Sequence, residues 1–200
     1  MKLFSYVVAR DYGFAPNPFY GVCTLATCKP EIRKHASIGD WVIGTGSKRN
    51  DRQRHLVYAM RVSEEMTFNE YWEGERFQRK KPNLRGSLKQ AFGDNIYFRD
   101  GEGQWQQLDS HHSYDDGTPN PYNVENDTQV DRMLLSTEYA YWGGSGPEIP
   151  QEFFDHAGFD ICAGRGYKCN FPESLVTDFI AWLRSLDKKG YLGAPLDWPE

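Results

Sequence analysis

The sequence predicts an α+β protein whose core is rich in β-strands and whose clearest helix lies near the C-terminus. Short runs of aromatic and β-branched residues recur up to Val62, and such runs are typical of strands. Apolar residues spaced three and four apart between Leu175 and Leu186 indicate an amphipathic helix. Hydrophobic residues make up 39% and aromatic residues 15% of the 200 residues. This length and composition predict one domain over residues 1–200.

The N-terminal part predicts a strand, a rigid loop and a short helix. Leu3–Ala9 is rich in aromatic and β-branched residues and predicts a buried strand. Phe14–Phe19 contains Pro16 and Pro18, which exclude a helix interior or a central strand, so we expect a loop that carries aromatic side chains. Pro30 predicts a short helix over 31–36, because proline fits the first helical turn.

The middle of the chain predicts two strands that flank a basic loop. A Gly-Asp turn at 39–40 leads into a predicted strand at Trp41–Thr45, and His55–Val62 predicts the next strand. Thr67–Glu70 has the spacing of a capping box, which predicts the start of a helix. Over about 76–130 short apolar pieces alternate with turn residues, and we expect a loop-rich insertion there.

The last third predicts one more strand and the amphipathic helix. Leu134–Trp142 predicts the strand, which ends at the glycine-rich turn Gly143–Pro147. Pro150–Phe153 is a further helix start. The amphipathic helix opens at Pro172 and stops before Lys188–Gly190. Its apolar face consists of Leu175, Val176, Phe179, Ile180, Leu183 and Leu186.

Composition excludes several classes of protein. No apolar run approaches the roughly 20 residues that a membrane span needs, and Met1–Arg10 does not resemble a secretory leader. We therefore expect a cytoplasmic protein with no membrane partner and no cofactor. The cysteines are too loosely spaced for a disulfide framework, and reduced thiols are expected, with a zinc site as the alternative. They are Cys23, Cys28, Cys162 and Cys169.

Charge is distributed unevenly along the chain, although the net charge is −5. Residues 76–89 and 48–54 are basic clusters, whereas residues 109–138 are strongly acidic. Basic clusters can hold the phosphates of a nucleic acid, although a solvated surface is the alternative. The predicted phosphate contacts are Lys48, Arg49, Arg79, Lys80, Lys81, Arg85 and Arg165.

Candidate ligand-binding residues follow the first predicted strand. Arg10 and Asp11 are placed to orient a polar ligand, and nearby aromatic rings offer faces on which a base can stack. The alternative is a salt-bridged turn over an aromatic core. The full predicted set is Arg10, Asp11, Tyr12, Phe14, Asn17, Phe19, Trp41, Thr45 and Ser47.

No catalytic signature is recognisable in the sequence. Gly44–Lys48 lacks the spacing of a P-loop, whereas Gly143–Pro147 and Gly164–Lys168 are glycine-rich turns that could approach a phosphate. Nucleophilic catalysis by Cys23 or Ser47 would need an adjacent base, which spacing cannot show. The segment at 109–116, which includes His111 and His112, is either a metal-binding or a solvated polar loop.

Three segments resemble the nucleotide modification associated domain type 2 family. They are Tyr6–Phe19, Gly39–Gly46, and Tyr141–Gly144 with Glu148–Pro150. The resemblance spans most of the chain and implies association with pathways that modify bases in DNA, largely in bacteria and phages. It supplies no catalytic motif.

A looser resemblance links Ile38–Gly44 and His55–Val62 to the Gly-Asp strand pair of PUA-like barrels, including the EVE and ASCH domains. It implies a mixed β-barrel or sheet with short peripheral helices and a pocket for modified bases. We therefore expect binding of DNA, RNA or a nucleotide that carries a modified base. One alternative is an enzyme that modifies or removes a base, with Arg10, Asp11 and Asn17 in orientation or proton transfer. Another is a non-catalytic partner-binding protein.

Overall fold

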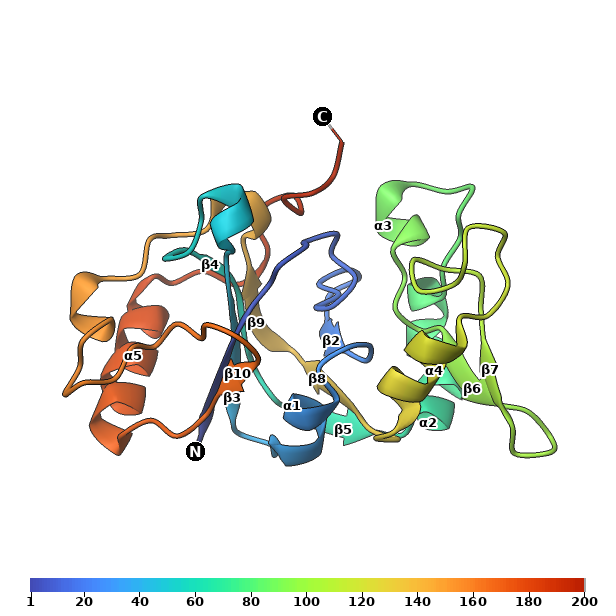
Figure 1. Ribbon diagram of the computed structural model, residues 1–200, viewed down its shortest axis with the longest axis horizontal. Helices are drawn as coiled ribbons and strands as arrows, with labels where there is room; N and C mark the ends of the chain where they lie inside the picture. Colours follow the sequence, from blue (N-terminus) through green and yellow to red (C-terminus); the bar gives the residue numbers. More distant parts are fainter. Residues whose placement is uncertain (200) are drawn as a thin grey trace. The chain divides into compact units, whose positions relative to one another are not determined.

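The computed structural model describes residues 1–199, and the chain divides into two compact units (Figure 1). Unit 1 comprises Met1–Asp11, Ala36–Val62 and Thr137–Glu200, and unit 2 comprises Tyr12–His35 and Ser63–Ser136. Each unit has its own cluster of buried apolar side chains. The expected single domain requires the two units to unfold together, and this stays a prediction.

Unit 1 is built on a six-stranded mixed sheet with the order β10-β1-β3-β4-β9-β11. Its strands are β1 (Leu3–Val7), β3 (Trp41–Thr45), β4 (Leu56–Arg61), β9 (Glu138–Tyr141), β10 (Tyr167–Lys168) and β11 (Gly190–Tyr191). β1 is parallel to β3, while β4 is antiparallel to β3 and β9. Short 3-10 turns lie in the connections, namely η1 (Lys48–Asn50), η3 (Gly143–Ser145) and η4 (Gln151–Phe153).

Close packing within this sheet explains one of its glycines. A Cβ atom at Gly44 would lie 2.5 Å from the ring of Tyr58 on the neighbouring strand. That ring is fully buried, and its hydroxyl donates to the Tyr6 hydroxyl at 3.0 Å. Glycine at this position therefore lets the aromatic ring pack directly against β3.

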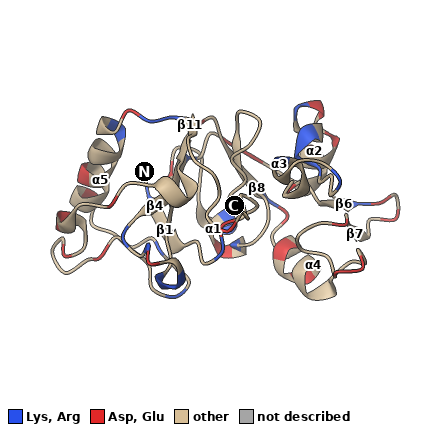
Figure 2. Cartoon of the chain, turned by 90° about the horizontal axis from the view of Figure 1, so that it is seen from above, with Lys and Arg blue, Asp and Glu red and all other residues tan. Residues whose placement is uncertain are grey.

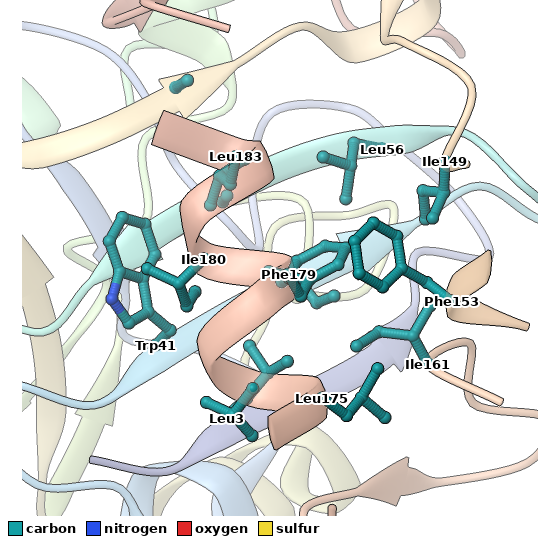
Figure 3. Packing of buried hydrophobic residues seen from close by; sticks show 14 of the residues in the cluster. Leu3, Trp41, Leu56, Ile149, Phe153, Ile161, Leu175, Phe179, Ile180 and Leu183 are labelled. Atoms are coloured by element: carbon teal, nitrogen blue, oxygen red, sulfur yellow. The ribbon is translucent and has the colours of Figure 1, made fainter. Parts of the chain in front are cut away.

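The helix α5 (Glu173–Ser185) packs on this sheet through its apolar face. Figure 3 shows Phe179 and Ile180 of the helix among Leu3, Trp41 and Leu56 of the strands. All five side chains are buried, and burial of apolar surface at roughly 25 cal/mol per Å² holds the helix in place. The predicted C-terminal helix is confirmed.

Unit 2 combines a small sheet, a hairpin and short helices. The sheet has the order β2-β8-β5, and β6 pairs with β7. The strands are β2 (Cys23–Leu25), β5 (Glu64–Met66), β6 (Tyr97–Arg99), β7 (Trp105–Gln107) and β8 (Met133–Ser136). The helices are α1 (Pro30–His35), α2 (Phe68–Glu73), η2 (Glu75–Lys80), α3 (Leu88–Ala91) and α4 (Pro121–Thr128). The stretch predicted as an insertion supplies Phe77, Ile96 and Tyr97 to the core of this unit.

The α+β class is confirmed, but the expectation of a barrel is not. Within residues 1–199 the largest sheet ends at β10 and β11 and does not close on itself. The single strand predicted over Leu134–Trp142 is wrong. Met133–Ser136 and Glu138–Tyr141 are separate strands of different sheets, because the former pairs with β2 and β5 and the latter with β4.

Several local predictions are confirmed. The strand at Trp41–Thr45 has the predicted bounds, and the short helix begins at Pro30. Thr67 and Glu70 form the expected capping box, with the Thr67 backbone N–H donating to Glu70 at 2.7 Å and the Glu70 N–H donating to Thr67 Oγ1 at 3.2 Å. In the part of the chain from 1 to 199, every helix is too short or too polar to cross a bilayer.

Candidate functional site

A thiol, an imidazole and a carboxylate lie together in unit 2. The sulfur of Cys28 is 3.6 Å from Nε2 of His112, and Nδ1 of His112 is 2.8 Å from Oδ2 of Asp127. Cys28 is partly exposed, the His112 side chain is 15% exposed, and the Asp127 side chain is fully buried. The three groups therefore form a relay that runs from the surface to the interior, with the sulfur at the accessible end.

The sulfur projects from a strained turn between a strand and a helix. Cys28 follows β2 and precedes α1. Its φ is 57° and that of Lys29 is 44°, both in the left-handed region that L-residues with a side chain rarely adopt. Such strain costs on the order of 1–3 kcal/mol per residue and collects at functional sites. A nucleophile on a sharp turn between a strand and a helix is exposed to a ligand.

The Asp127 carboxylate is committed to holding the relay in place. Its Oδ1 accepts from the Cys28 backbone N–H at 2.8 Å and from the Asn126 amide at 3.1 Å. Its Oδ2 accepts from the Tyr97 hydroxyl at 2.9 Å and pairs with His112. Four partners use the acceptor capacity of a carboxylate. Although these three residues cluster closely enough to surround an ion, Asp127 serves better as an orienting group than as a metal ligand.

Arg33 ties the nucleophile turn to the end of α4. This guanidinium is fully buried, and its Nε donates to the Cys28 carbonyl at 2.9 Å. Its terminal nitrogens donate to the Asp127 carbonyl at 2.5 Å and the Val130 carbonyl at 2.8 Å. Burial lowers the pKa of Arg33 to about 10, and the Asp127 charge opposes that shift. One side chain therefore fixes the spacing between the sulfur-bearing turn and the carboxylate.

The electrostatics favour a protonated imidazole at His112. Burial alone would lower its pKa, but the hydrogen bonds and electrostatic interactions that His112 makes with Asp127 and Cys28 raise the pKa of His112 to about 10. Burial also raises the pKa of Tyr97 well above its ordinary value, with Asp127 adding to the effect. Tyr97 is therefore a neutral hydrogen-bond donor, and Asp127 supplies the negative charge that holds an imidazolium beside the sulfur.

Aromatic rings surround the relay on the side of the predicted aromatic loop. The Phe14 ring lies 4.6 Å from that of His112. Tyr12 stacks on Phe92 with centroids 5.1 Å apart and contacts the His111 ring at 4.7 Å. Tyr12 and Phe92 are partly exposed, and His111 is exposed. Of the predicted ligand-binding residues, Phe14 therefore lies against His112 but is buried, and Tyr12 lies against His111 and is partly exposed. Whether either residue contacts a ligand stays a prediction.

Other predicted residues of unit 2 are interior side chains. Asn17 and Phe19 are buried, and so is Lys80, at 1% exposure. The Lys80 ammonium donates to the Asn17 carbonyl at 3.0 Å, to Asn17 Oδ1 at 2.7 Å and to Thr24 Oγ1 at 2.9 Å. The expectation that Lys80 contacts phosphate at the surface does not fit this burial, because its charge is used inside the unit.

The remaining basic residues predicted in unit 2 stay at the surface. Arg79 is exposed and lies over the Tyr20 ring at 4.4 Å, and Lys81 lies over the Trp72 ring at 3.4 Å. Arg85 is exposed. Figure 2 shows both basic and acidic residues around α2 and α3, and acidic residues on α4. The basic and acidic runs of the sequence lie on different elements of unit 2.

The predicted residues of unit 1 do not form one cluster. Asp11 is buried, and its carboxylate accepts from the Tyr141 hydroxyl at 2.5 Å and the Leu196 N–H at 3.1 Å. Asp11 is therefore a structural acceptor and is not exposed for proton transfer. Trp41, Thr45 and Ser47 are also buried. The exposed members of the predicted set in unit 1 are Arg10, Lys48, Arg49 and Arg165.

Sequence reasoning does not single out Cys28. It weighed Cys23, but that thiol is fully buried and burial raises its pKa to about 12, so it is an inert core group. The available signal was the position of Cys28 between a predicted loop and the helix opened by Pro30. His112 had been noted only as a possible metal ligand. Asp127 had been noted only as one of many acids.

Comparison with known proteins identifies the family. The family model described as nucleotide modification associated domain 2 matches residues 1–200, which is the whole chain. No curated protein and no solved structure matches the chain. The resemblance noted in three sequence segments is therefore confirmed along the entire length, and the chain belongs to the nucleotide modification associated domain 2 family.

Proposed function

We propose that this protein is a thiol-dependent enzyme that acts on a nucleotide or on a base of a nucleic acid. Cys28 is the nucleophile, His112 carries the proton, and Asp127 orients His112. One observation carries the proposal: the sulfur of Cys28, a partly exposed residue, lies 3.6 Å from an imidazole whose other nitrogen is 2.8 Å from a buried carboxylate. Membership of the family supports a context related to nucleotide modification.

The relay suits covalent catalysis at an electrophilic carbon, such as the carbonyl of an acyl or amide group carried by a nucleotide. The sulfur attacks the carbon, and the thiol proton is held on Nε2 of His112. His112 then gives this proton to the departing amine or alcohol, which leaves a thioester on Cys28. Water hydrolyses the thioester, with His112 taking the proton of the water and the carboxylic acid departing.

The rings beside the relay suit a planar substrate. Tyr12, Phe92 and His111 are each at least partly exposed, and aromatic faces bind bases by stacking worth about 1–3 kcal/mol per base. Basic side chains of the same unit, Arg79 and Arg85, are exposed and offer contacts for phosphates. These features support a nucleotide as the class of substrate.

A second candidate is the non-catalytic binding of DNA, RNA or a nucleotide with a modified base. The exposed basic side chains between Arg76 and Lys89 favour it, because phosphate contacts supply most of the affinity of such proteins. This candidate does not depend on a PUA-like barrel. We also propose a cytoplasmic setting that is bacterial or phage-related, which is compatible with either candidate function.

Selective alkylation tests the nucleophile. At pH 7, iodoacetamide should modify Cys28 first, Cys23 should not react, and the His112→Gln variant should slow modification of Cys28 on the order of tenfold. Peptide mass spectrometry measures each site, and Cys169 serves as an internal reference for a partly exposed thiol. Equal rates at Cys28 and Cys169, unchanged by His112→Gln, would contradict the proposal.

A product search tests the reaction. Nucleosides, nucleotides and oligonucleotides with acylated or otherwise modified bases are incubated with the protein and analysed by mass. We expect a mass-shifted nucleoside with the wild-type chain and none with Cys28→Ser, while Cys169→Ser behaves as wild type. Binding without turnover, unchanged in Cys28→Ser and weakened by salt, would instead support the second candidate.

A further inference from the structure

Two adjoining hollows on unit 1 share the residues Asp160 and Lys168. The first has a volume of about 540 Å³ and is lined in part by Lys48, Arg54 and Lys168. The second has a volume of about 600 Å³ and is lined in part by aromatic residues. One hollow is therefore cationic and the other aromatic, and neither involves the thiol relay of unit 2.

Two of the three cations of the first hollow, Arg54 and Lys168, are held in place by the protein itself. The Lys168 ammonium donates to the carbonyls of Asp160 at 3.0 Å and Cys162 at 2.7 Å. The Arg54 guanidinium lies 4.3 Å from the Phe154 ring centroid and donates to Gln151 at 3.0 Å. A positioned cation loses little conformational freedom when it binds a ligand.

The ionisable side chains that line the first hollow carry an excess of positive charge. Asp160 Oδ1 accepts from the Cys162 N–H at 2.7 Å. Among the described lining residues, Lys48, Arg54 and Lys168 carry positive charge and Asp160 carries negative charge. Burial raises the pKa of the Cys162 thiol to about 12, so this sulfur is a neutral wall atom at pH 7. The chemistry of the hollow is that of an anion site.

Glycines at the rim allow an anion to approach the backbone. Gly164 lines the first hollow, and an added Cβ there would meet no atom within 4 Å. Gly46 also lines it, and a Cβ at that position would collide with the Arg52 carbonyl. Gly46 is therefore required by close packing against Arg52, whereas the open space at Gly164 leaves room for phosphate oxygens near the backbone.

The second hollow offers flat apolar surfaces. Its lining includes Phe159, Tyr167 and Phe171, with the Asn170 amide among them. Phe159 is 41% exposed, and the Tyr167 ring stacks on Phe4 with centroids 6.2 Å apart. The exposed Phe159 ring and the partly exposed rings of Tyr167 and Phe171, with one adjacent amide, suit a heteroaromatic base, which stacks and forms a hydrogen bond.

We propose that unit 1 binds a nucleoside phosphate, with the phosphate in the cationic hollow and the base in the aromatic hollow. The ligand spans the shared wall formed by Asp160 and Lys168. This site is separate from Cys28 and does not rest on the proposed thiol chemistry. A free nucleotide and the end of a nucleic acid strand present the same chemical groups, and the test separates them.

Calorimetric titration with adenosine 5′-monophosphate, adenosine, inorganic phosphate and a 5′-phosphorylated oligonucleotide tests this site. We expect adenosine 5′-monophosphate to bind at least about tenfold more tightly than either adenosine or inorganic phosphate, because it uses both hollows. If the oligonucleotide binds more tightly than adenosine 5′-monophosphate, the site is assigned to strand ends. If it binds more weakly, the site is assigned to free nucleotides. Equal affinity for inorganic phosphate and adenosine 5′-monophosphate would overturn the base-binding part.

Matched variants locate the ligand. Lys48→Gln with Arg54→Gln should weaken adenosine 5′-monophosphate binding at least about tenfold, whereas Phe159→Ala should weaken it without changing phosphate binding. Lys2→Gln is the control, because Lys2 is exposed and precedes β1, while Val7 at the other end of that strand lines the hollow. Binding that survives Lys48→Gln with Arg54→Gln but is lost in Cys28→Ser would overturn the proposal and place the ligand in unit 2.

Discussion

Unit 1 and unit 2 bury different kinds of side chain. In unit 1 the buried carboxylates of the described chain are Asp11 and Asp40, and its core is the apolar interface between α5 and the sheet. Unit 2 buries cations as well as anions. Its buried charged residues are Arg33, Lys80, Asp94 and Asp127. One unit is stabilised mainly by apolar packing, and the other also depends on paired polar networks.

This difference concerns how each unit compensates the charges that it buries. A buried charge is costly unless hydrogen bonds and an opposite charge compensate it. In unit 2 the charges form two networks, one around Lys80 and Asp94 in the interior and one around Asp127 that reaches the partly exposed Cys28. The second network places the charges of the interior within reach of a ligand.

Truncation of the apolar core of unit 1 should have the largest effect on stability. Phe179→Ala removes a fully buried ring that contacts Phe153 at a centroid distance of 5.2 Å. We expect a loss of about 3–5 kcal/mol in the free energy of unfolding, measured in urea. Asp178→Ala, on the exposed face of the same helix, should change it by less than about 0.5 kcal/mol. Similar losses in the free energy of unfolding for Phe179→Ala and Asp178→Ala would contradict the view that apolar packing is the main source of stability in unit 1.

Removal of one buried charge from unit 2 should have the next largest effect on the free energy of unfolding. Lys80→Met leaves Asn17 and Thr24 without their donor and Asp94 without its nearby cation. We expect a loss of about 3 kcal/mol, because breaking a buried network uncovers unpaired groups. The exposed Lys89→Met is the control. One urea transition in both variants would support a single domain, whereas loss of unit 2 alone would show two.

The pH dependence of stability should reveal the relay. The pKa of His112 is raised to about 10 in the folded chain, against about 6.5 when unfolded. The stabilisation is therefore complete below pH 6.5 and is lost as the pH rises through about 10. The difference between the two pKa values sets an upper limit of about 5 kcal/mol on the loss over this range. Urea titrations at several pH values measure it, and an equal slope in His112→Gln would contradict this origin.

Local structure could be predicted where neighbouring residues decide it. The strand at Trp41–Thr45, the helix that begins at Pro30 and the capping box at Thr67 follow from propensity and spacing within a few residues. The break between two strands after Ser136 could not be predicted, because the two halves of Leu134–Trp142 have similar composition. Only their pairing with distant strands separates them.

The site escaped prediction for the same reason. Cys28, His112 and Asp127 are separated by 84 and 15 positions, so the relay exists only after the polar loop and α4 fold against the turn. The aromatic loop was identified because prolines and rings are visible locally. Its Phe14 lies beside His112 of the relay but is buried, as Asn17 and Phe19 are. Tyr12 is partly exposed and contacts the neighbouring His111.

The smallest expected effect comes from an exposed cap in unit 2. Thr67→Ala removes the side chain that accepts from the Glu70 N–H at 3.2 Å at the start of α2. We expect a loss of about 1 kcal/mol, measured by urea unfolding, because a lost cap leaves one helix N–H to water. Thr67→Ser keeps the hydroxyl and should retain most of the stability. A loss from Thr67→Ala as large as that from Lys80→Met would mean that surface capping contributes as much as the buried networks to unit 2, and the contrast between the units would then no longer depend on buried charge.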